Sequence, residues 1–230
     1  MPTPATEDYL KTIYKLQENA EAASTNAVAD RMGVSAASVT NMMKRLSETG
    51  LVEHRPYQAI RLTEAGRKIA LEIIRHHRLL EVYMAEALGF TWDQVDAEAE
   101  RLEHVISEEF EDKIDAMLGY PTTDPHGSPI PSKDGSIATT KHDRLADMEA
   151  GCTVVVRRVT DTDPALLRYL AKLGLRPENT VEVLSKEPFE GPMLLRVGGE
   201  EHHVGRQVAH TVLVESLPAG EGSDKGRTDP

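Results

Sequence analysis

The segment "DAEAERLEHVISEEFED" (96–112) gathers eight carboxylates around one histidine. If it forms a helix, Asp96, Glu100, Glu103 and His104 share one face, because they follow the helical repeat. Like charges at these spacings repel one another, so a buried face of this kind needs a compensating cation. Carboxylate oxygens and an imidazole nitrogen are ligands for Mn²⁺, Fe²⁺, Zn²⁺ or Co²⁺. The segment therefore indicates a divalent metal site, with a solvated acidic surface as the alternative.

Two other segments carry residues of the same kind. "RHHRLLE" places His77 and Glu81 one helical turn apart. "TEDYL" places Glu7 and Asp8 at the start of an expected helix, where acids also favour the helix dipole without binding anything. Candidate metal ligands are thus distributed over three expected helices.

The first 63 residues predict a winged helix-turn-helix. An amphipathic helix is expected over 8–17, followed by two short helices. The first of these is capped by Thr25 or Asn26 and ends at Gly33, and the second runs from Ser35 to Gly50. Their connection of about three residues is typical of a helix-turn-helix. Residues 51–63 predict a hairpin, which would form the wing.

The rest of the chain predicts more helices and then a β module. A long helix is expected from Thr63 to about Leu88, another from a capping box at Thr91 through the acidic segment, and a third over 108–118. Residues 119–136 hold four prolines and three glycines and predict a loop. Short β-prone runs with one inserted helix, about 165–173, then predict a small barrel. The fold class is mainly α with a C-terminal β module.

The net charge of −12 is spread unevenly and limits where nucleic acid can bind. Residues 1–75 have a balance of +1, whereas residues 76–136 have a balance of −10. DNA, if bound, must therefore be bound by the first segment. The single cysteine, Cys152, excludes a disulfide framework and favours a reduced compartment. No apolar run is long enough to span a membrane, so we expect a cytoplasmic protein without a membrane partner.

The second helix of the helix-turn-helix, 35–47, is the candidate recognition helix. Its small polar face can enter the major groove closely, and basic residues on and around it can reach phosphates. The candidate DNA contacts are Ser35, Ala37, Ser38, Thr40, Asn41, Lys44, Arg45, Arg55 and Arg61.

At this point the motifs amount to a family resemblance over most of residues 6–216. "TEDYLKTIYKL", "SAASVTNMMKRLSETGLV", "LTEAGRKIA", "RHHRLLE", "EAERLEHVISEE" and "DPHGSPIP" together resemble the diphtheria toxin repressor and manganese transport regulator family. The resemblance implies a winged helix-turn-helix DNA-binding domain (1–70), a helical dimerisation and metal-binding domain (71–136) and an SH3-like barrel (137–216). A disordered tail (217–230) is expected from its composition.

The resemblance also implies which residues bind metal. The primary ligands fall on Asp8, Glu100, Glu103 and His104, and those of a second site fall on His77, Glu81 and Asp96. An acidic ligand from the barrel falls on Asp163. Manganese-type members carry a glutamate three residues after the first aspartate, where this chain has Lys11. Two separated sites per subunit are therefore favoured over a binuclear centre.

The expected function is that of a metal-activated repressor of metal homeostasis genes and not of an enzyme. The primary ligands include no sulfur, which favours Mn²⁺, with Fe²⁺ next. The metal would bridge Asp8 to the other primary ligands in a homodimer bound to a double-stranded operator with two-fold symmetric half-sites. The first alternative is a metalloenzyme that uses the same cluster, although the sequence has no nucleophile elbow, phosphate loop or HExxH motif. The second is a winged-helix regulator that responds to an organic ligand.

Overall fold

The structure is a computed structural model that describes residues 2–18, 23–53, 58–160 and 163–217. The chain divides into two compact units. Unit 1 comprises Met1–Leu88, Ala97–Thr122 and Pro129–Ala138, and unit 2 comprises Gly89–Asp96, Thr123–Ser128 and Thr139–Pro230. Each unit is described by itself.

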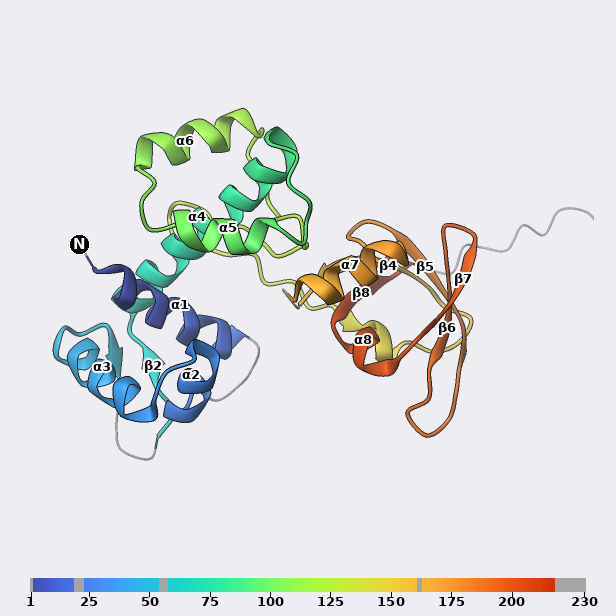
Figure 1. The fold of residues 1–230 in the computed structure, drawn as a ribbon, viewed down its shortest axis with the longest axis horizontal. Helices are drawn as coiled ribbons and strands as arrows, with labels where there is room; N and C mark the ends of the chain where they lie inside the picture. The colour runs from blue at the N-terminus through green and yellow to red at the C-terminus, as the bar shows by residue number, and fades with distance from the viewer. Residues whose placement is uncertain (1, 19–22, 54–57, 161–162, 218–230) are drawn as a thin grey trace, which may run out of the picture. The chain divides into compact units, whose positions relative to one another are not determined.

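Unit 1 begins with α1 (Pro4–Glu18), after which α2 (Thr25–Met32) and α3 (Ala36–Glu48) form the predicted helix-turn-helix (Figure 1). Ser35 caps α3 as predicted, but the cap of α2 is Ser24 and not Thr25 or Asn26. Ser24 fits because its extended backbone lets its hydroxyl accept from the Ala27 N–H, whereas the two predicted residues are already helical. The helices share one apolar core, which includes Leu10, Ile13, Val28, Val39 and Met43.

A short wing follows α3. Strands β1 (Val52–Glu53) and β2 (Arg61–Leu62) pair antiparallel, while the predicted turn falls partly on residues 54–57, outside the described residues. Gly66 lets the next helix approach the wing closely, because a Cβ there would lie 2.0 Å from the Leu51 carbonyl oxygen. The wing is thus held against the start of that helix.

The helical part of unit 1 is built on α4 (Glu64–Ala87), which Thr63 caps as predicted. Helix α4 packs against both α1 and α6 (Glu108–Met117). Arg75 of α4 is a buried anchor. It forms ion pairs with Glu111 and Asp115 of α6 and donates to the Pro131 carbonyl oxygen at 2.8 Å. One guanidinium therefore fixes α6 and the proline-containing loop to α4.

The acidic segment departs from the prediction of a continuous helix. Helix α5 (Val95–Leu102) begins four residues after Thr91, and a turn over 103–107 separates it from α6. The capping-box contact itself is present, since the Thr91 N–H donates to Gln94 Oε1 at 3.1 Å. Because α5 ends at Leu102, Glu103 and His104 lie beyond the helix, and their side chains are directed by the turn.

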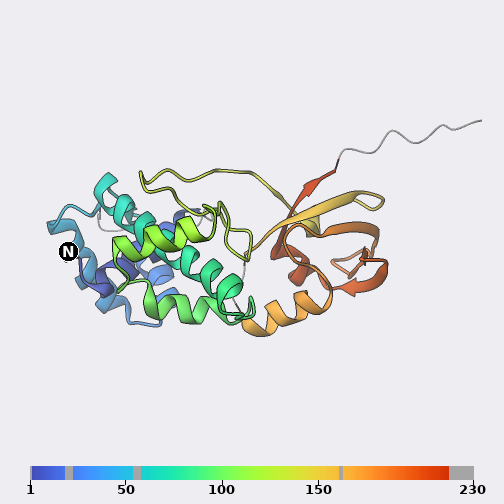
Figure 2. The same ribbon diagram turned by 90° about the horizontal axis from the view of Figure 1, so that it is seen from above.

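Unit 2 contains the predicted β module. Its strands form an antiparallel sheet in the order β3–β8–β4–β5–β6–β7, and register shifts in the β4–β8 and β5–β6 pairs are consistent with the strongly bent ribbons in both views (Figure 1, Figure 2). The bounds are β3 (Asp143–Arg144), β4 (Thr153–Val159), β5 (Thr180–Lys186), β6 (Met193–Val197), β7 (Glu200–Val204) and β8 (Val212–Ser216), with α7 (Pro164–Lys172) and α8 (Arg206–His210).

Two segments from earlier in the chain belong to unit 2. Trp92 is buried in the apolar core of the barrel and stacks on His126 with ring centroids 5.7 Å apart. Nε2 of His126 also forms a hydrogen bond with the Trp92 carbonyl oxygen at 2.7 Å, and the backbone carbonyl oxygen of His126 accepts from the Val159 N–H at 2.8 Å. The two units therefore do not follow the chain in single blocks, and the four-segment division given by the sequence stays a proposal.

In the described part of the chain, no helix combines the length and the apolar character needed to cross a membrane. The predicted disordered tail falls almost entirely on residues 218–230, outside the described residues.

Candidate metal centre

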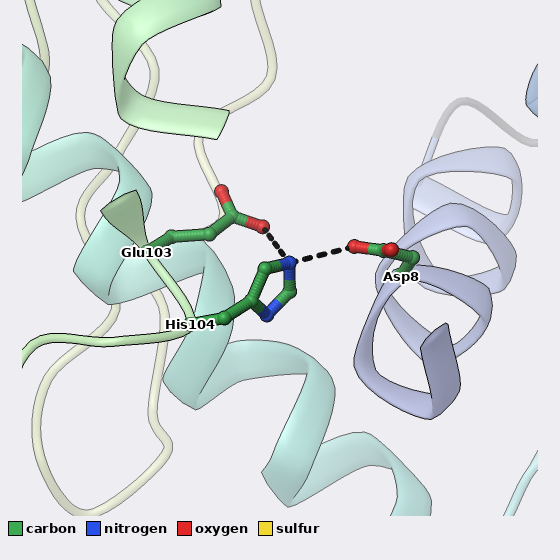
Figure 3. A group of neighbouring side chains, drawn as sticks. All are labelled: Asp8, Glu103 and His104. Carbon is green, nitrogen blue, oxygen red and sulfur yellow. Dashed lines mark ion pairs between the residues drawn. The ribbon is translucent and has the colours of Figure 1, made fainter. Parts of the chain in front are cut away.

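Side chains of Asp8, Glu103 and His104 converge on one point of unit 1 (Figure 3). Asp8 lies on α1, whereas Glu103 and His104 directly follow α5. His104 Nε2 is 2.8 Å from Asp8 Oδ1 and 3.4 Å from Glu103 Oε1. Ligand atoms of all three residues lie within 4.8 Å of one another. Two carboxylates and an imidazole so arranged can hold a divalent cation between two parts of the chain.

The Asp8 carboxylate shows that this group fits a cation. Its Oδ1 is buried and lies 2.8 Å from His104 Nε2, but among the described residues it accepts no hydrogen bond. Burial raises the pKa of Asp8 above its usual 3.8; nearby His104 opposes this shift, and the charge of Glu100 adds to it. A buried carboxylate oxygen that accepts no hydrogen bond is costly, and a metal ion bound by both Asp8 and His104 would offset this cost.

Glu7 orients the histidine of this group. Its Oε2 lies 2.7 Å from His104 Nδ1, on the opposite side of the ring from the nitrogen that faces Asp8. A carboxylate that accepts from Nδ1–H fixes the tautomer, so that Nε2 presents a lone pair to a metal. Glu7 is therefore a positioning residue, a role that the sequence did not assign to it. The sequence feature that could have indicated this role is the position of Glu7 directly before the candidate ligand Asp8.

A second cluster, the Lys11 group, is formed by Lys11, His77, Glu100 and Glu103. Lys11 Nζ lies 2.7 Å from Glu100 Oε2, 2.6 Å from Glu103 Oε2 and 3.3 Å from His77 Nδ1. His77 Nδ1 also lies 2.5 Å from Glu103 Oε2. Lys11 is 4% exposed and Glu103 is fully buried. The two clusters share Glu103, which lies between the ammonium and His104.

In the Lys11 group, charge pairing and hydrogen bonding together shift the pKa values more than burial does. Burial lowers the pKa of Lys11, but the carboxylates of Glu103 and Glu100 reverse this and hold it above the usual 10.5. Burial raises the pKa of Glu103, but the hydrogen bond from His77 and the charge of Lys11 bring it below the usual 4.5. The pair is thus stabilised as ammonium and carboxylate. From the sequence, Lys11 was notable only because it stands where manganese-type members of the family have a glutamate ligand, and its pairing with Glu100 and Glu103 was not predicted.

The predicted ligands are only partly gathered at the first cluster. Glu100 is half exposed, and one of its oxygens pairs with Lys11. His77 contacts Glu103 through Nδ1 and lies 3.6 Å from Glu81 Oε1 through Nε2, so within unit 1 the ring of His77 lies between Glu103 and Glu81.

Asp96 and Asp163 belong to unit 2. Asp163 caps α7, where Oδ1 accepts from the N–H groups of Ala165 at 2.7 Å and Leu166 at 3.3 Å. The structure therefore gives Asp163 a local role, and the metal-binding roles of Asp96 and Asp163 remain predictions from the sequence.

The predicted DNA-binding face is solvent-exposed. Val39, Met43 and Leu46 turn one side of α3 into the core, which leaves the other side free for a ligand. Arg55 lies outside the described residues. The other predicted contacts are all exposed: Ser35, Ala37, Ser38, Thr40, Asn41, Lys44, Arg45 and Arg61.

Family models match nearly the whole chain. The N-terminal DNA binding domain of iron dependent repressors matches residues 1–60, their metal binding and dimerisation domain matches 63–132, and the FeoA domain matches 144–216. The iron-dependent repressor IdeR of Mycobacterium leprae is 34% identical over 224 residues, which cover 92% of this chain and 97% of that protein. The diphtheria toxin repressor of Corynebacterium diphtheriae is 28% identical, with coverage of 92% and 97%.

Solved structures of similar proteins cover the same length. A manganese-dependent transcriptional repressor in complex with manganese is 39% identical, covers 92% of this chain and 100% of that one, and has a TM-score of 0.86. The manganese regulator SloR is 33% identical, with coverage of 94% and 100% and a TM-score of 0.76. ScaR with bound Cd²⁺ is 33% identical, with the same coverage and a TM-score of 0.78.

Proposed function

Because this chain belongs to the iron-dependent repressor family and is a metal-activated, DNA-binding transcriptional repressor, we propose that Mn²⁺ or Fe²⁺ activates it by joining α1 to the turn after α5. The observation that carries the proposal is the convergence of Asp8 with Glu103 and His104, with a buried Asp8 oxygen that accepts no hydrogen bond among the described residues. We propose Glu100 as the fourth ligand, since only one of its oxygens is drawn to Lys11 in the contacts described.

The choice of metal follows from the ligand atoms. Three carboxylates and one imidazole offer hard oxygen donors and no sulfur, a set that suits Mn²⁺ and Fe²⁺ better than thiolate-seeking ions. The similar solved structure with bound manganese supports Mn²⁺, and the mycobacterial relative named as iron-dependent supports Fe²⁺. We place Mn²⁺ first. A second site is proposed at His77 and Glu81, while Asp96 stays a sequence-based addition to it.

Activation would act through α1, which links the metal to the DNA-binding helices. Helix α1 packs on α2 and α4, so fixing Asp8 limits the positions that α2 and α3 can take. A bound dication would also reduce the acidic charge of residues 76–136, which otherwise repels DNA. Allosteric coupling between two ligands ordinarily amounts to about 1–3 kcal/mol.

The proposed DNA partner is a double-stranded operator with two-fold symmetric half-sites, bound by a homodimer in the cytoplasm. The metal binding and dimerisation model matched by residues 63–132 supports the dimer. So do large apolar side chains left exposed in this part of the chain, since a second copy could cover them. These are Leu102, Val105, Phe110 and Met117.

Calorimetric titration of metal-free protein with Mn²⁺ tests this proposal, with and without a duplex selected from a random-sequence library by the Mn²⁺-loaded protein. Because coupling is reciprocal, the duplex should tighten Mn²⁺ binding by about 5–150-fold. Asp8→Asn serves as the matched variant and should lose most of this gain. The same Mn²⁺ affinity with and without duplex would contradict the proposal.

A further inference from the structure

The Lys11 group has the composition of a metal site but already contains a cation. Ligand atoms of His77, Glu100 and Glu103 lie within 4.8 Å of one another, as do those of the Asp8 cluster. The Lys11 ammonium lies among them, 2.6 to 3.3 Å from each residue. We propose that Lys11 is a resident cation of this group, so that the centre accepts one metal ion beside Asp8 and His104 and not an adjacent pair. This inference rests on the function proposed above.

Pairing with two carboxylates holds the ammonium in this buried position. Lys11 is 4% exposed, and both oxygens of the fully buried Glu103 accept from Nζ, at 2.8 and 2.6 Å. A second ion could enter only by displacing an ammonium that has little access to water, and its own hydration would be lost as well. Glu103 therefore bridges one metal and one ammonium, where a binuclear centre would have a carboxylate bridging two metals.

The position of Lys11 also assigns it a mechanical role. It lies one turn after Asp8 on α1, and its partners lie on α4, on α5 and directly after α5. The ammonium therefore attaches α1 to the helical part of unit 1 without any metal. Lys11 thus joins α1 to the helical part of unit 1 in the metal-free protein, whereas Asp8 would join the same two parts through a bound metal ion.

Electron paramagnetic resonance during a Mn²⁺ titration tests the resident cation. The native protein should give a six-line Mn²⁺ pattern without exchange coupling at every ratio, because the proposed sites beside Asp8 and at His77 and Glu81 share no bridging carboxylate. Lys11→Glu removes the ammonium and adds an oxygen ligand, so it should give the exchange-coupled spectrum of two ions about 3.5–4 Å apart. Lys15→Glu makes the same charge change one turn further along α1 and should behave as the native protein.

A coupled pair in the native protein would overturn the inference, and so would a folded Lys11→Glu variant that never shows coupling. A native protein that takes up no Mn²⁺ at all would instead overturn the proposed function. In that case a metal-free measurement still decides the role of Lys11.

That measurement is the melting temperature of the metal-free Lys11→Met variant. Without the ammonium, the buried Glu103 keeps only its contact with His77 and loses its charged partner, so the melting temperature should fall by about 5–15 °C relative to the native protein. Excess Mn²⁺ should recover most of this loss, because a second ion can then enter. Lys15→Met is the control and should melt close to the native temperature. An unchanged melting temperature for metal-free Lys11→Met would show that the ammonium is dispensable.

Discussion

Glu7 and Asp8 are neighbours in the chain but approach opposite nitrogens of the same imidazole. Glu7 lies beside Nδ1 of His104 and Asp8 beside Nε2. The sequence places both acids at a helix start, where their effect on the helix dipole is a sufficient explanation. Only the folded structure separates the two roles, because the histidine that they share comes from a turn almost a hundred residues later.

Glu7→Ala should weaken Mn²⁺ binding by about 10–100-fold, which is the usual cost of removing the partner that orients a histidine ligand. The ring of His104 would lose its fixed tautomer, while the ligand atoms themselves remain. Calorimetric titration with Mn²⁺ measures the effect. Glu18→Ala, at the far end of α1, is the control, and equal losses in both variants would assign the effect to helix stability.

Asp8→Met should weaken activation by Mn²⁺ more than activation by Fe²⁺. The substitution removes a hard, charged oxygen and supplies a thioether, from which Mn²⁺ gains little. Binding constants for both ions, measured under anaerobic conditions together with the affinity of the loaded protein for a duplex, separate selectivity from folding. Equal changes in the binding constants of both ions, with unchanged duplex affinity, would show that Asp8 only stabilises the start of α1.

The contacts of Glu103 could not be predicted from the spacing of residues in the sequence. In the sequence it is one acid among eight in a segment that repels itself, and removing it looks favourable for folding. In the structure it is buried and paired with Lys11 and His77, which lie 92 and 26 residues away in the chain. Its neighbours depend on how three helices pack, and no local pattern records that packing.

The helices and strands could be predicted from the sequence more successfully than the contacts between them. Caps such as Ser35 and Thr63 mark helix starts because a side-chain oxygen must satisfy a free backbone N–H, which is a local requirement. The end of α5 was missed, because a turn in a charged stretch has no glycine or proline to mark it. The short strand β7, "EEHHV", could not be predicted from the sequence because it lacks the apolar alternation of the strands around it.

The junction of α4 and α6 should be sensitive to acid. Burial alone would raise the pKa of Glu111, but hydrogen bonds from His76 and Arg75 lower it from 4.5 to about 2. Since the folded pKa lies below the unfolded one, the stabilisation is complete above about pH 4.5 and is lost as the pH falls towards 2.

Glu111→Gln should therefore lower the free energy of unfolding by about 1.5–3 kcal/mol at neutral pH, since it removes one of the two carboxylates that pair with the buried Arg75. The difference between variant and native protein should shrink as the pH falls from 4.5 towards 2. Urea denaturation followed by circular dichroism measures both trends. Glu109→Gln, on an exposed face of α6, should change little, and a pH-independent deficit in Glu111→Gln would show that shape and not charge is responsible.

Helix α3 should bind phosphates through its exposed cations. Lys44→Ala and Arg45→Ala should each weaken binding to every duplex and reduce the slope of log affinity against log salt concentration by about 1. Anisotropy titrations at several salt concentrations measure the slope. Lys113→Ala, on α6, removes a charge outside the helix-turn-helix and should leave the slope unchanged. If all three variants had the same slope as the native protein, α3 would not be in contact with the DNA phosphates.

Taken as a whole, the chain joins a nearly neutral DNA-binding segment to a strongly acidic metal-binding one, and the candidate metal centre lies where the two meet within unit 1. The sequence supports this plan because composition, charge and motif order are visible along the chain. It does not show that segments 89–96 and 123–128 belong with the barrel, since that depends on Trp92 and His126 entering contacts with distant strands.

We propose that metal bound at Asp8, Glu103 and His104 controls DNA binding. The most direct test is the affinity of the native protein for a selected duplex, measured by fluorescence anisotropy at one salt concentration, with saturating Mn²⁺ and with a chelator. We predict binding at least about fivefold tighter with Mn²⁺, the lower end of ordinary allosteric coupling, and no such gain in His104→Ala. Equal affinity with Mn²⁺ and with chelator in the native protein would show that metal at this site does not control DNA binding.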